Sequence, residues 1–479
     1  MSARKFGRCL ALAALLGGAA MTAVAADAGG LADLEARLRK LEEEQKRVNE
    51  GLARDELSER EPELTSRLKA VEYQALGMLK QARTIEALEG ITAGMSLTTV
   101  GQWPSGIRTP TASDLDGRFR DSQLNYRADV FVGLPLDKIG DVESRVFAHI
   151  RFGQGTGLND FYSFSKPNAS AFRVTAVSPD DSVAILGQAW YQATIPLPFG
   201  GFKPHSKEKL EINFGKMDPF VFFDQNAAAN DETRQYLNTV FVHNPLLDAG
   251  GDIGVDANGF APGFRASYYN YTDKREPWRI SAGVFGSGQG ARYTNFFAST
   301  LTIVQVEKQF QLAAGLPGNY RVYGWRNAAA PGFAGEAEKR TGFGASIDQR
   351  VADATTVFLR YGRQTHGAAM RFDRAVSVGA EIGGSCWSRG GDSLGIAHGW
   401  LRTANAFREA SNTLDADANG IPDYGFAAGR GEQVTEIYYR YRLNKQFEIS
   451  PDAQFVRNPA GNPDTRLAHF VGVRAQITY

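Results

Sequence analysis

The stretch HFVGVRAQITY, residues 469–479, alternates between two kinds of side chain and indicates the fold class. A β-strand points successive side chains to opposite faces, so its residues separate into two sets with a period of two. One face is apolar and ends in an aromatic residue: Val471, Val473, Ala475, Ile477 and Tyr479. The other face is mostly polar: Phe470, Gly472, Arg474, Gln476 and Thr478. The stretch therefore predicts a strand whose apolar face meets either a protein core or lipid.

Residues 1–26 have the order of a secretory signal peptide. Arg4 and Arg8 belong to a positive start, an apolar run follows from Cys9 to about Val24, and small alanines provide a cleavage site. The run is too short and wrongly flanked for a permanent membrane span. No later run of about 18 or more apolar residues occurs, so we expect no transmembrane helix.

Charge and cysteine content limit the class of protein further. The three basic residues of the predicted leader leave 50 Lys+Arg against 53 Asp+Glu, and this near balance argues against a nucleic-acid surface. Cys386 is the one cysteine after cleavage, so we expect no internal disulfide. The remaining chain of about 450 residues is long enough for one large barrel or for two or three ordinary domains.

Residues 27–90 carry the pattern of a helical coiled coil. Gly51 and Pro62 lie around a break between two heptad seams, and the proline should end or restart the helix. The first seam is Leu31, Leu34, Leu38, Leu41, Val48 and Leu52, and the second is Leu64, Leu68, Val71, Ala75, Met78, Ala82 and Ile85. These narrow seams favour a coiled coil between copies of the chain. A single amphipathic helix packed on its own domain is the alternative.

Residues 91–479 change to short alternating runs separated by clusters of Gly, Asn, Asp and Pro. Such strands fit a sandwich with buried apolar faces or a membrane barrel with its apolar faces in lipid. The export signal, the aromatic residues at strand ends and the alternation of long loops with short turns favour a barrel, which must close to pair every backbone donor. We predict an all-β transmembrane barrel of about 16 antiparallel strands, with about 18 as the alternative, preceded by the α-helical coiled coil.

The polar faces of the predicted strands should line the pore. They carry charges of both signs that can hydrogen-bond sugar hydroxyls, and aromatic rings that can stack on sugars. The charged candidates are Arg127, Asp129, Arg145, Arg151, Glu211, Arg360, Glu381, Glu436, Arg440, Arg442 and Arg474. The aromatic candidates are Phe147, Trp190 and Phe358. The alternative is that the charges pair only with each other and keep a wide lumen wet and stiff.

The stretch FFDQNAAANDETRQYLN, residues 222–238, is a candidate constriction loop. Pro219 should end the preceding strand, and Asn230 or Asp231 is positioned to cap a short helix through Leu237. A loop this apolar is expected to fold into the barrel and narrow it. The residues expected to meet the solute are Phe222, Phe223, Asp224, Asn226, Asp231, Arg234 and Gln235. A loop packed over the rim or on a subunit interface is the alternative.

The stretch DADANGIPD, residues 415–423, spaces oxygen-bearing side chains as a calcium loop does. The candidate ligands are Asp415, Asp417, Asn419 and Asp423. The glutamate that closes an EF-hand is absent, because Phe426 stands at its position. An ordinary polar loop is therefore the alternative to a structural Ca²⁺ site, and we expect no other cofactor.

Several long stretches resemble the carbohydrate-selective outer-membrane porins of the OprB type. LEINFGKMDPFVFFDQNAAANDETRQYLNTVFVHNP (210–245) resembles the signature region of that family, and HIRFGQGTGLNDFYSFS (149–165) resembles a strand that ends in its Gly-rich turn. GFGASIDQRVADATTVFLRYG (342–362) and GDSLGIAHGW (391–400) are similar to later strands, and TEIYYRYRLNKQFEISPDAQFVRNPAGNP (435–463) resembles the family's ending. The resemblance covers nearly all of the predicted barrel. It implies a barrel of about 16 strands that passes sugars or other small polar solutes. The coiled coil departs from the plainer members and is similar to periplasmic extensions of other porins.

We therefore predict a passive porin in the outer membrane of a Gram-negative bacterium, with its N-terminal helix in the periplasm. The expected partners are outer-membrane lipid, small polar solutes, two further copies of the chain in a homotrimer, and peptidoglycan through the coiled coil; nucleic acid is not expected. One alternative is a barrel that mainly anchors a coiled-coil tether to the cell wall. The other is a barrel hydrolase, but the inward sets offer Arg and Glu with little His or Ser for a nucleophile and its base.

Overall fold

The computed structural model describes the barrel and the loops inside it. The described residues are 43, 83–84, 91–105, 122–158, 161–171, 182–198, 206–248, 259–287, 293, 295–312, 315–334, 337–367, 370–416, 418–465 and 467–479. The predicted signal peptide and nearly all of the predicted coiled coil lie outside these residues, so both stay predictions. Among the described helices, none is long and apolar enough to cross a membrane.

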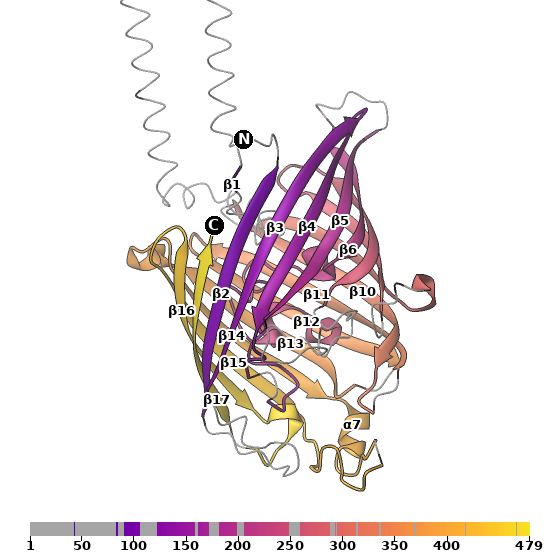
Figure 1. Cartoon of the computed structure of the whole chain (residues 1–479), viewed down its shortest axis with the longest axis vertical. Helices are drawn as coiled ribbons and strands as arrows, with labels where there is room; N and C mark the ends of the chain where they lie inside the picture. The colour runs from indigo at the N-terminus through magenta and orange to yellow at the C-terminus, as the bar shows by residue number, and fades with distance from the viewer. Residues whose placement is uncertain are drawn as a thin grey trace, which may run out of the picture.

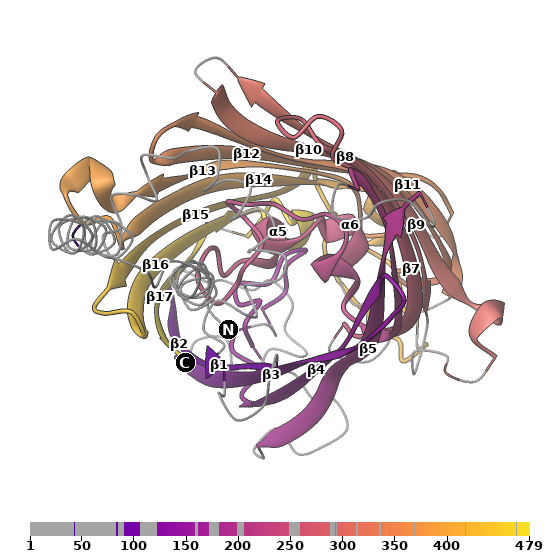
Figure 2. The same cartoon turned by 90° about the horizontal axis from the view of Figure 1, so that it is seen from above.

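In the part of the chain that the structure describes, one antiparallel sheet has 17 strands, and 16 of them, β2 to β17, close into a ring (Figures 1 and 2). Neighbours in sequence are neighbours in the ring, and β1 (Arg83–Thr84) adds a short pairing to β2. The prediction of a 16-stranded barrel is confirmed. The strands are β2 (Thr92–Ser105), β3 (Gln123–Ile139), β4 (Val142–Gln154), β5 (Val183–Leu197), β6 (Glu208–Met217), β7 (Ala261–Asn270), β8 (Trp278–Gly286), β9 (Thr300–Leu312), β10 (Leu316–Pro331), β11 (Ala337–Ala352), β12 (Thr355–Gly367), β13 (Phe372–Gly383), β14 (Ser393–Thr403), β15 (Gly431–Arg442), β16 (Phe447–Arg457) and β17 (Ala468–Thr478). The short helices are η3 (Pro219–Val221), α5 (Thr239–Val242), α6 (Pro245–Asp248), η5 (Phe296–Ala298), η7 (Gly384–Trp387), α7 (Asn405–Ala410) and η8 (Pro459–Gly461).

The stretch 469–479 closes the ring. β17 pairs with β2 along almost its whole length. Tyr479 N donates to Met95 O at 2.8 Å, and Met95 N donates to Tyr479 O at 3.1 Å, so the terminal tyrosine is still hydrogen-bonded as a strand residue. The closed ring leaves no free sheet edge among β2 to β17, which satisfies the backbone groups of every spanning strand.

The side-chain alternation is inverted relative to a soluble sheet. On β3, Leu124 is 70% exposed whereas its neighbour Asn125 is 2% exposed. On β17, Val471 is 54% exposed whereas Arg474 is 2% exposed. Apolar side chains therefore point out of the barrel and polar side chains point into it, which is the arrangement that a barrel surrounded by lipid requires. The environment that meets the apolar faces is the bilayer.

The two rims of the barrel differ in the length of their connections (Figure 1). At the rim that holds the C-terminus the turns are short, as between β3 and β4, where Gly140 supplies a positive φ of 63°. At the opposite rim lie the long connections β4–β5, β6–β7 and β14–β15, the last of which carries α7. Membrane barrels place short turns in the periplasm and long loops outside, which assigns the C-terminal rim to the periplasmic side.

The segment between β6 and β7 turns back into the barrel, where α5 and α6 lie inside the ring (Figure 2). Its apolar side chains pack on rings of the inner wall: Phe223, Tyr236, Phe241 and Leu246 with Phe285, Tyr323 and Phe358. The hydrophobic core of this protein therefore lies within the barrel, between a loop and the wall.

The predicted helix from Asn230 or Asp231 through Leu237 was wrong, because this part of the segment forms a turn. Asp231 Oδ1 accepts hydrogen bonds from the amide and hydroxyl of Thr233, an arrangement that competes with helix formation. The helix begins later, where the Asn238 side chain caps the first turn of α5 by accepting from the Val240 amide.

Candidate functional site

The inward segment 218–248 contains the predicted constriction loop 222–238 and is called the constriction loop below. A buried ion pair anchors it to the wall. Arg360 on β12 donates to Asp224 Oδ1 at 3.1 Å and to two loop carbonyls at 2.6 and 2.9 Å. Asp224 also accepts a hydrogen bond of 2.6 Å from the Tyr323 hydroxyl. Burial raises the pKa of Asp224, although Arg360 opposes the rise. Two predicted site residues, one on the wall and one on the loop, are thus partners of each other.

Four other predicted loop residues also face the wall. Phe222 and Phe223 pack edge-to-face on aromatic rings of β5 and β8. Asn226 donates to a hydroxyl of β11 at 3.1 Å, and Gln235 donates to Glu381 at 2.8 Å. All four are buried, so their observed contacts fix the loop in place.

The predicted lining residues Arg474 and Glu436 lie against the constriction loop and hydrogen-bond its backbone. Arg474 Nη1 donates to the Gln235 carbonyl at 2.7 Å. Glu436 accepts hydrogen bonds from the amides of Leu237 and Asn238 at 2.5 and 2.9 Å. These inward-facing side chains of the wall therefore hold the backbone of the loop in place.

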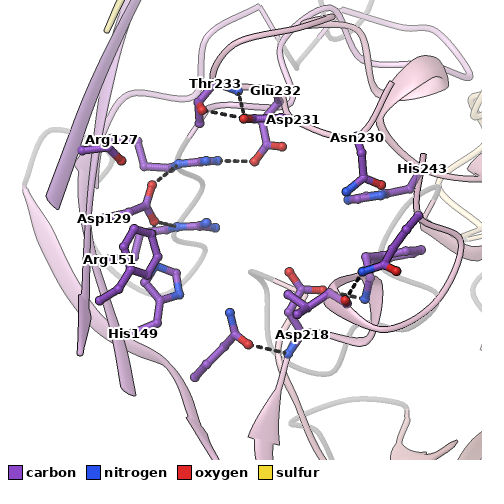
Figure 3. Close-up of a pocket in the computed structure, with 16 residues that line it drawn as sticks. Arg127, Asp129, His149, Arg151, Asp218, Asn230, Asp231, Glu232, Thr233 and His243 are labelled. Atoms are coloured by element: carbon purple, nitrogen blue, oxygen red, sulfur yellow. Dashed lines mark hydrogen bonds and ion pairs between the residues drawn. The ribbon is translucent and has the colours of Figure 1, made fainter. Parts of the chain in front are cut away.

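A cavity of about 120 Å³ remains between the constriction loop and the wall formed by β3 and β4. It is large enough for several water molecules. Figure 3 shows that its wall side presents Arg127, Asp129, His149 and Arg151. The loop side presents Asp218, Asn230, Asp231, Glu232, Thr233 and His243. Three predicted wall residues and the predicted loop residue Asp231 are thus brought together around one opening.

The charged groups of this cavity are paired within the wall and across the gap. Arg127 donates to Asp129 at 2.9 Å and reaches Glu232 on the loop at 2.7 Å. Arg151 donates to Asp129 Oδ1 at 2.7 Å, and His149 Nε2 hydrogen-bonds the same oxygen at 2.7 Å. Because both arginines have carboxylate partners, their field on a passing ion is partly cancelled.

The loop groups around the cavity have shifted pKa values. Burial raises the pKa of Asp218 to about 6 and also raises that of Asp231. Burial acts in the same direction on Glu232, but the two opposite arginines outweigh it and hold its pKa below the ordinary value. Burial lowers the pKa of His243 to about 3, so its imidazole is neutral at physiological pH.

Three polar atoms at the cavity have no hydrogen-bond partner among the described residues: His149 Nδ1, Asn230 Oδ1 and His243 Nδ1. Buried polar groups are costly when they are left unpaired. Each of these atoms is shielded from solvent, so a water or a solute hydroxyl would reach it only after the side chains around it moved.

A second group of predicted lining charges lies on β13, β15 and β16. Arg440 lies 3.6 Å from Glu381, and Arg442 lies 3.7 Å from Glu448. Glu448 also binds Arg234 of the constriction loop at 2.5 Å. Arg234 is half-buried, as Asp231 is, so direct contact with a solute stays a proposal for these two of the seven predicted loop residues.

The last predicted lining residues lie on β4 to β7. Arg145 donates to Gln192 at 2.8 Å, and Glu211 binds Arg265 at 2.6 Å. These contacts connect neighbouring strands. Glu211 pairs with an opposite charge, whereas Arg145 contacts a neutral amide.

The aromatic candidates are closed off from the lumen. Phe147 stacks on Trp190 with ring centroids 4.8 Å apart, and Phe358 packs against Tyr236 of the constriction loop. All three predicted rings are buried. They stabilise the wall and the loop in this structure, and stacking on a sugar would require their neighbours to move.

A second inward loop went unpredicted. The described residues 161–171 of the β4–β5 connection contact the constriction loop through two backbone hydrogen bonds of 2.7 and 3.0 Å. Phe161 and Phe164 of this loop are buried in the inner apolar cluster. The spacing of these two phenylalanines in an otherwise polar loop was the sequence feature that could have indicated that the loop packs inside the barrel.

The candidate calcium loop is held by its own backbone. Asp415 accepts from two amides at 3.0 and 2.7 Å, Asn419 from one at 2.8 Å and Asp423 from one at 3.0 Å. Asp417 lies outside the described residues. Within the described part of the chain, no group of three His, Cys, Asp or Glu side chains is placed to hold a metal. The calcium site stays a prediction, and these hydrogen bonds are those of an ordinary Asx-rich loop.

Comparison with known proteins agrees with this geometry. The profile of the carbohydrate-selective porin, OprB family, matches residues 150–479. The chain belongs to this family. The high-pH structure of Pseudomonas putida OprB is similar with a TM-score of 0.62 at 16% identity, covering 81% of this chain and 93% of that one. The outer-membrane channel DcaP of Acinetobacter baumannii has a TM-score of 0.45 at 12% identity, covering 83% of this chain and 100% of that one. A comparison with curated proteins finds no match.

Family and fold establish the class of function. The OprB-family chain is an outer-membrane channel for small solutes in a Gram-negative bacterium, and it is not an enzyme. Transport through such a channel depends on the size of the opening and on the groups that line it.

Proposed function

We propose that this OprB-family channel favours neutral, hydroxyl-rich solutes, sugars foremost, over ions of similar size. The supporting observation is the cavity between β3, β4 and the constriction loop, which is lined by neutral polar side chains and by charges of both signs that are paired with each other. A hydroxyl group both donates and accepts hydrogen bonds, so a sugar can use acceptors on the loop and donors on the wall.

Ions meet an unfavourable group on one side of this opening. An anion that approaches Arg151 also approaches the carboxylates of Glu232 and Asp231. A cation that approaches those carboxylates meets the guanidinium groups of Arg127 and Arg151. A neutral polyol has no such penalty, and this difference is the physical basis of the proposed preference.

Liposome swelling tests the proposal. Vesicles that contain the purified protein should admit a neutral hexose several-fold faster than the corresponding sugar acid or amino sugar of nearly equal size. The same sugar should reduce the ionic current of single channels in planar bilayers. Equal rates for all three solutes would remove the proposal while leaving the porin assignment intact.

Asn230→Ala provides a matched test of the lining. It removes a neutral polar side chain that lines the cavity and leaves the ion pairs in place. We expect weaker block by sugar with little change in ionic conductance. Asn444→Ala at the short turn between β15 and β16 is the control, because the side chain of that asparagine bonds only local backbone amides in the described contacts.

We also propose that the channel is a homotrimer whose N-terminal helix lies in the periplasm and contacts peptidoglycan. The heptad seams of residues 27–90 and the resemblance to helical extensions of other porins support this. Deletion of residues 27–90 tests it: loss of trimers identifies an assembly element, and loss of peptidoglycan binding with retained trimers identifies a tether. Unchanged mass and unchanged binding would refute both roles.

A further inference from the structure

Glu432 is a carboxylate on the inner face of β15 whose hydrogen-bond donors all lie in connections between strands. It is 0% exposed. Ser163 Oγ donates to it at 2.7 Å, Phe164 N at 2.7 Å, and Ser165 through its amide and hydroxyl at 3.0 and 2.6 Å. Ala460 N, in the β16–β17 connection, donates at 2.8 Å. These five donors are backbone amides and hydroxyls, and they come from two separate connections.

A buried carboxylate is tolerated when several donors converge on it, and such charge-assisted hydrogen bonds are among the stronger ones in proteins. Three of the donors are amides of the chain itself, so their positions define the backbone path of the two connections. Glu432 therefore holds residues 161–171 against the wall.

Residues 161–171 transmit this constraint to the constriction loop. Ala169 N donates to Leu237 O at 2.7 Å, and a second backbone hydrogen bond of 3.0 Å joins the two loops. Glu436, four residues along the same face of β15, accepts from the Leu237 amide at 2.5 Å. The Leu237 residue is thus held through its N–H by the wall and through its C=O by the loop that Glu432 fixes.

We propose that Glu432 is a positioning residue for solute selection: through residues 161–171 it holds the constriction loop in place and so sets the size of the opening. Glu432 is absent from the residues that line the cavity, so it acts without touching the solute. The inference rests on the proposed function for its solutes, but the loop mechanism itself can be measured with ions alone.

Glu432→Gln tests the proposal. The amide keeps the size of the side chain, but its NH₂ group faces donors that have lost an acceptor. We expect the population with displaced loops to rise about tenfold. In bilayers this should appear as added open-channel noise or a larger conductance, and in liposomes as a higher ratio of trisaccharide to monosaccharide flux. Hydrogen exchange should accelerate in peptides that cover residues 161–171 and residues 231–243.

Asp392→Asn is the matched control. It makes the same kind of change at a buried carboxylate whose described partners, Arg389, Tyr439 and the Arg442 amide, lie in the β13–β14 connection and on β15 and touch neither loop. It should leave the noise, the flux ratio and exchange in both loops near wild type. If Glu432→Gln does not fold, the double variant Ser163→Ala, Ser165→Ala removes two hydroxyl donors and should change the same readouts in the same direction by a smaller factor.

A folded Glu432→Gln channel with wild-type noise, flux ratio and exchange would overturn the inference. So would acceleration of exchange in residues 161–171 with no change at residues 231–243, because the coupling between loops would then be absent. A wild-type channel that admits no sugar, yet gains noise on Glu432→Gln, would refute the proposed solute class and support the positioning role.

Discussion

Replacement of Arg360 by methionine should release the constriction loop while leaving the barrel folded. Arg360 makes four hydrogen bonds to this loop, two to Asp224 and two to the carbonyls of Phe241 and Ala229. Arg360 and Asp224 are both almost completely buried. Removing one partner of such a pair costs about 3–5 kcal/mol, because the other charge is left uncompensated. The displaced loop should therefore become at least about 100-fold more populated.

The assay is single-channel conductance together with the size limit for sugar uptake into liposomes. The strand ladders of β11, β12 and β13 do not depend on the Arg360 side chain, so we expect a variant that still assembles and conducts. Its conductance should be larger or noisier than that of wild type, and larger saccharides should enter. Adding Asp224→Asn should recover about 1–3 kcal/mol, because the stranded charge is removed.

Arg402→Met is the control for this experiment. Arg402 pairs with Asp373 on the neighbouring strand, and both side chains are about a third exposed, at 32% and 29%. Such a pair is worth less than about 1 kcal/mol. Wild-type conductance and a wild-type size limit in folded Arg360→Met would refute the view that this ion pair anchors the loop.

Three further outcomes are expected. Because the pKa of Asp218 is about 6, its carboxyl loses its negative charge as the pH falls through that value, so the permeability ratio of cations to anions should decrease between pH 7 and pH 5. Reversal potentials in a salt gradient measure this ratio, and Asp218→Asn should flatten the change. Glu232→Gln removes the loop partner of Arg127 and should shift the reversal potential toward the value for anion selectivity at every pH above 5. An unchanged reversal potential would exclude Glu232 from the conduction path. Val473→Arg places a charge on the lipid face and should destabilise the folded barrel by up to about 2–4 kcal/mol, as measured by urea titration in vesicles. A variant as stable as wild type would contradict the assignment of this face to lipid.

The alternation of side chains predicted the barrel and its inner face because a strand has a fixed period of two. Arg127, Asp129 and Arg151 were assigned to the lumen from sequence alone, and the same parity on β4 places His149 beside them. The alternation of side chains along a strand is a local property, so once one residue is known to face the lumen, the faces of its neighbours on that strand follow.

The partners of those residues could not be predicted in the same way. Asp224 and Arg360 are 136 positions apart in sequence, and their contact exists because the loop after β6 crosses the lumen to β12. Glu232, Asn230 and His243 follow no period, since they lie in turns and short helices whose side-chain directions depend on the fold around them. The helix predicted through Leu237 failed for a related reason: local hydrogen bonds of Asp231 and Thr233 favoured a turn.

The sequence by itself determined that the chain forms strands with one apolar and one polar face, because alternation is a pattern of neighbouring residues, and it predicts an export signal before them. The tertiary structure alone decided which charges remain open to a solute. Closing the ring brings two loops and the far wall into contact, and burial then gives most inward charges structural partners. The cavity between β3, β4 and the constriction loop is where we propose that selection occurs.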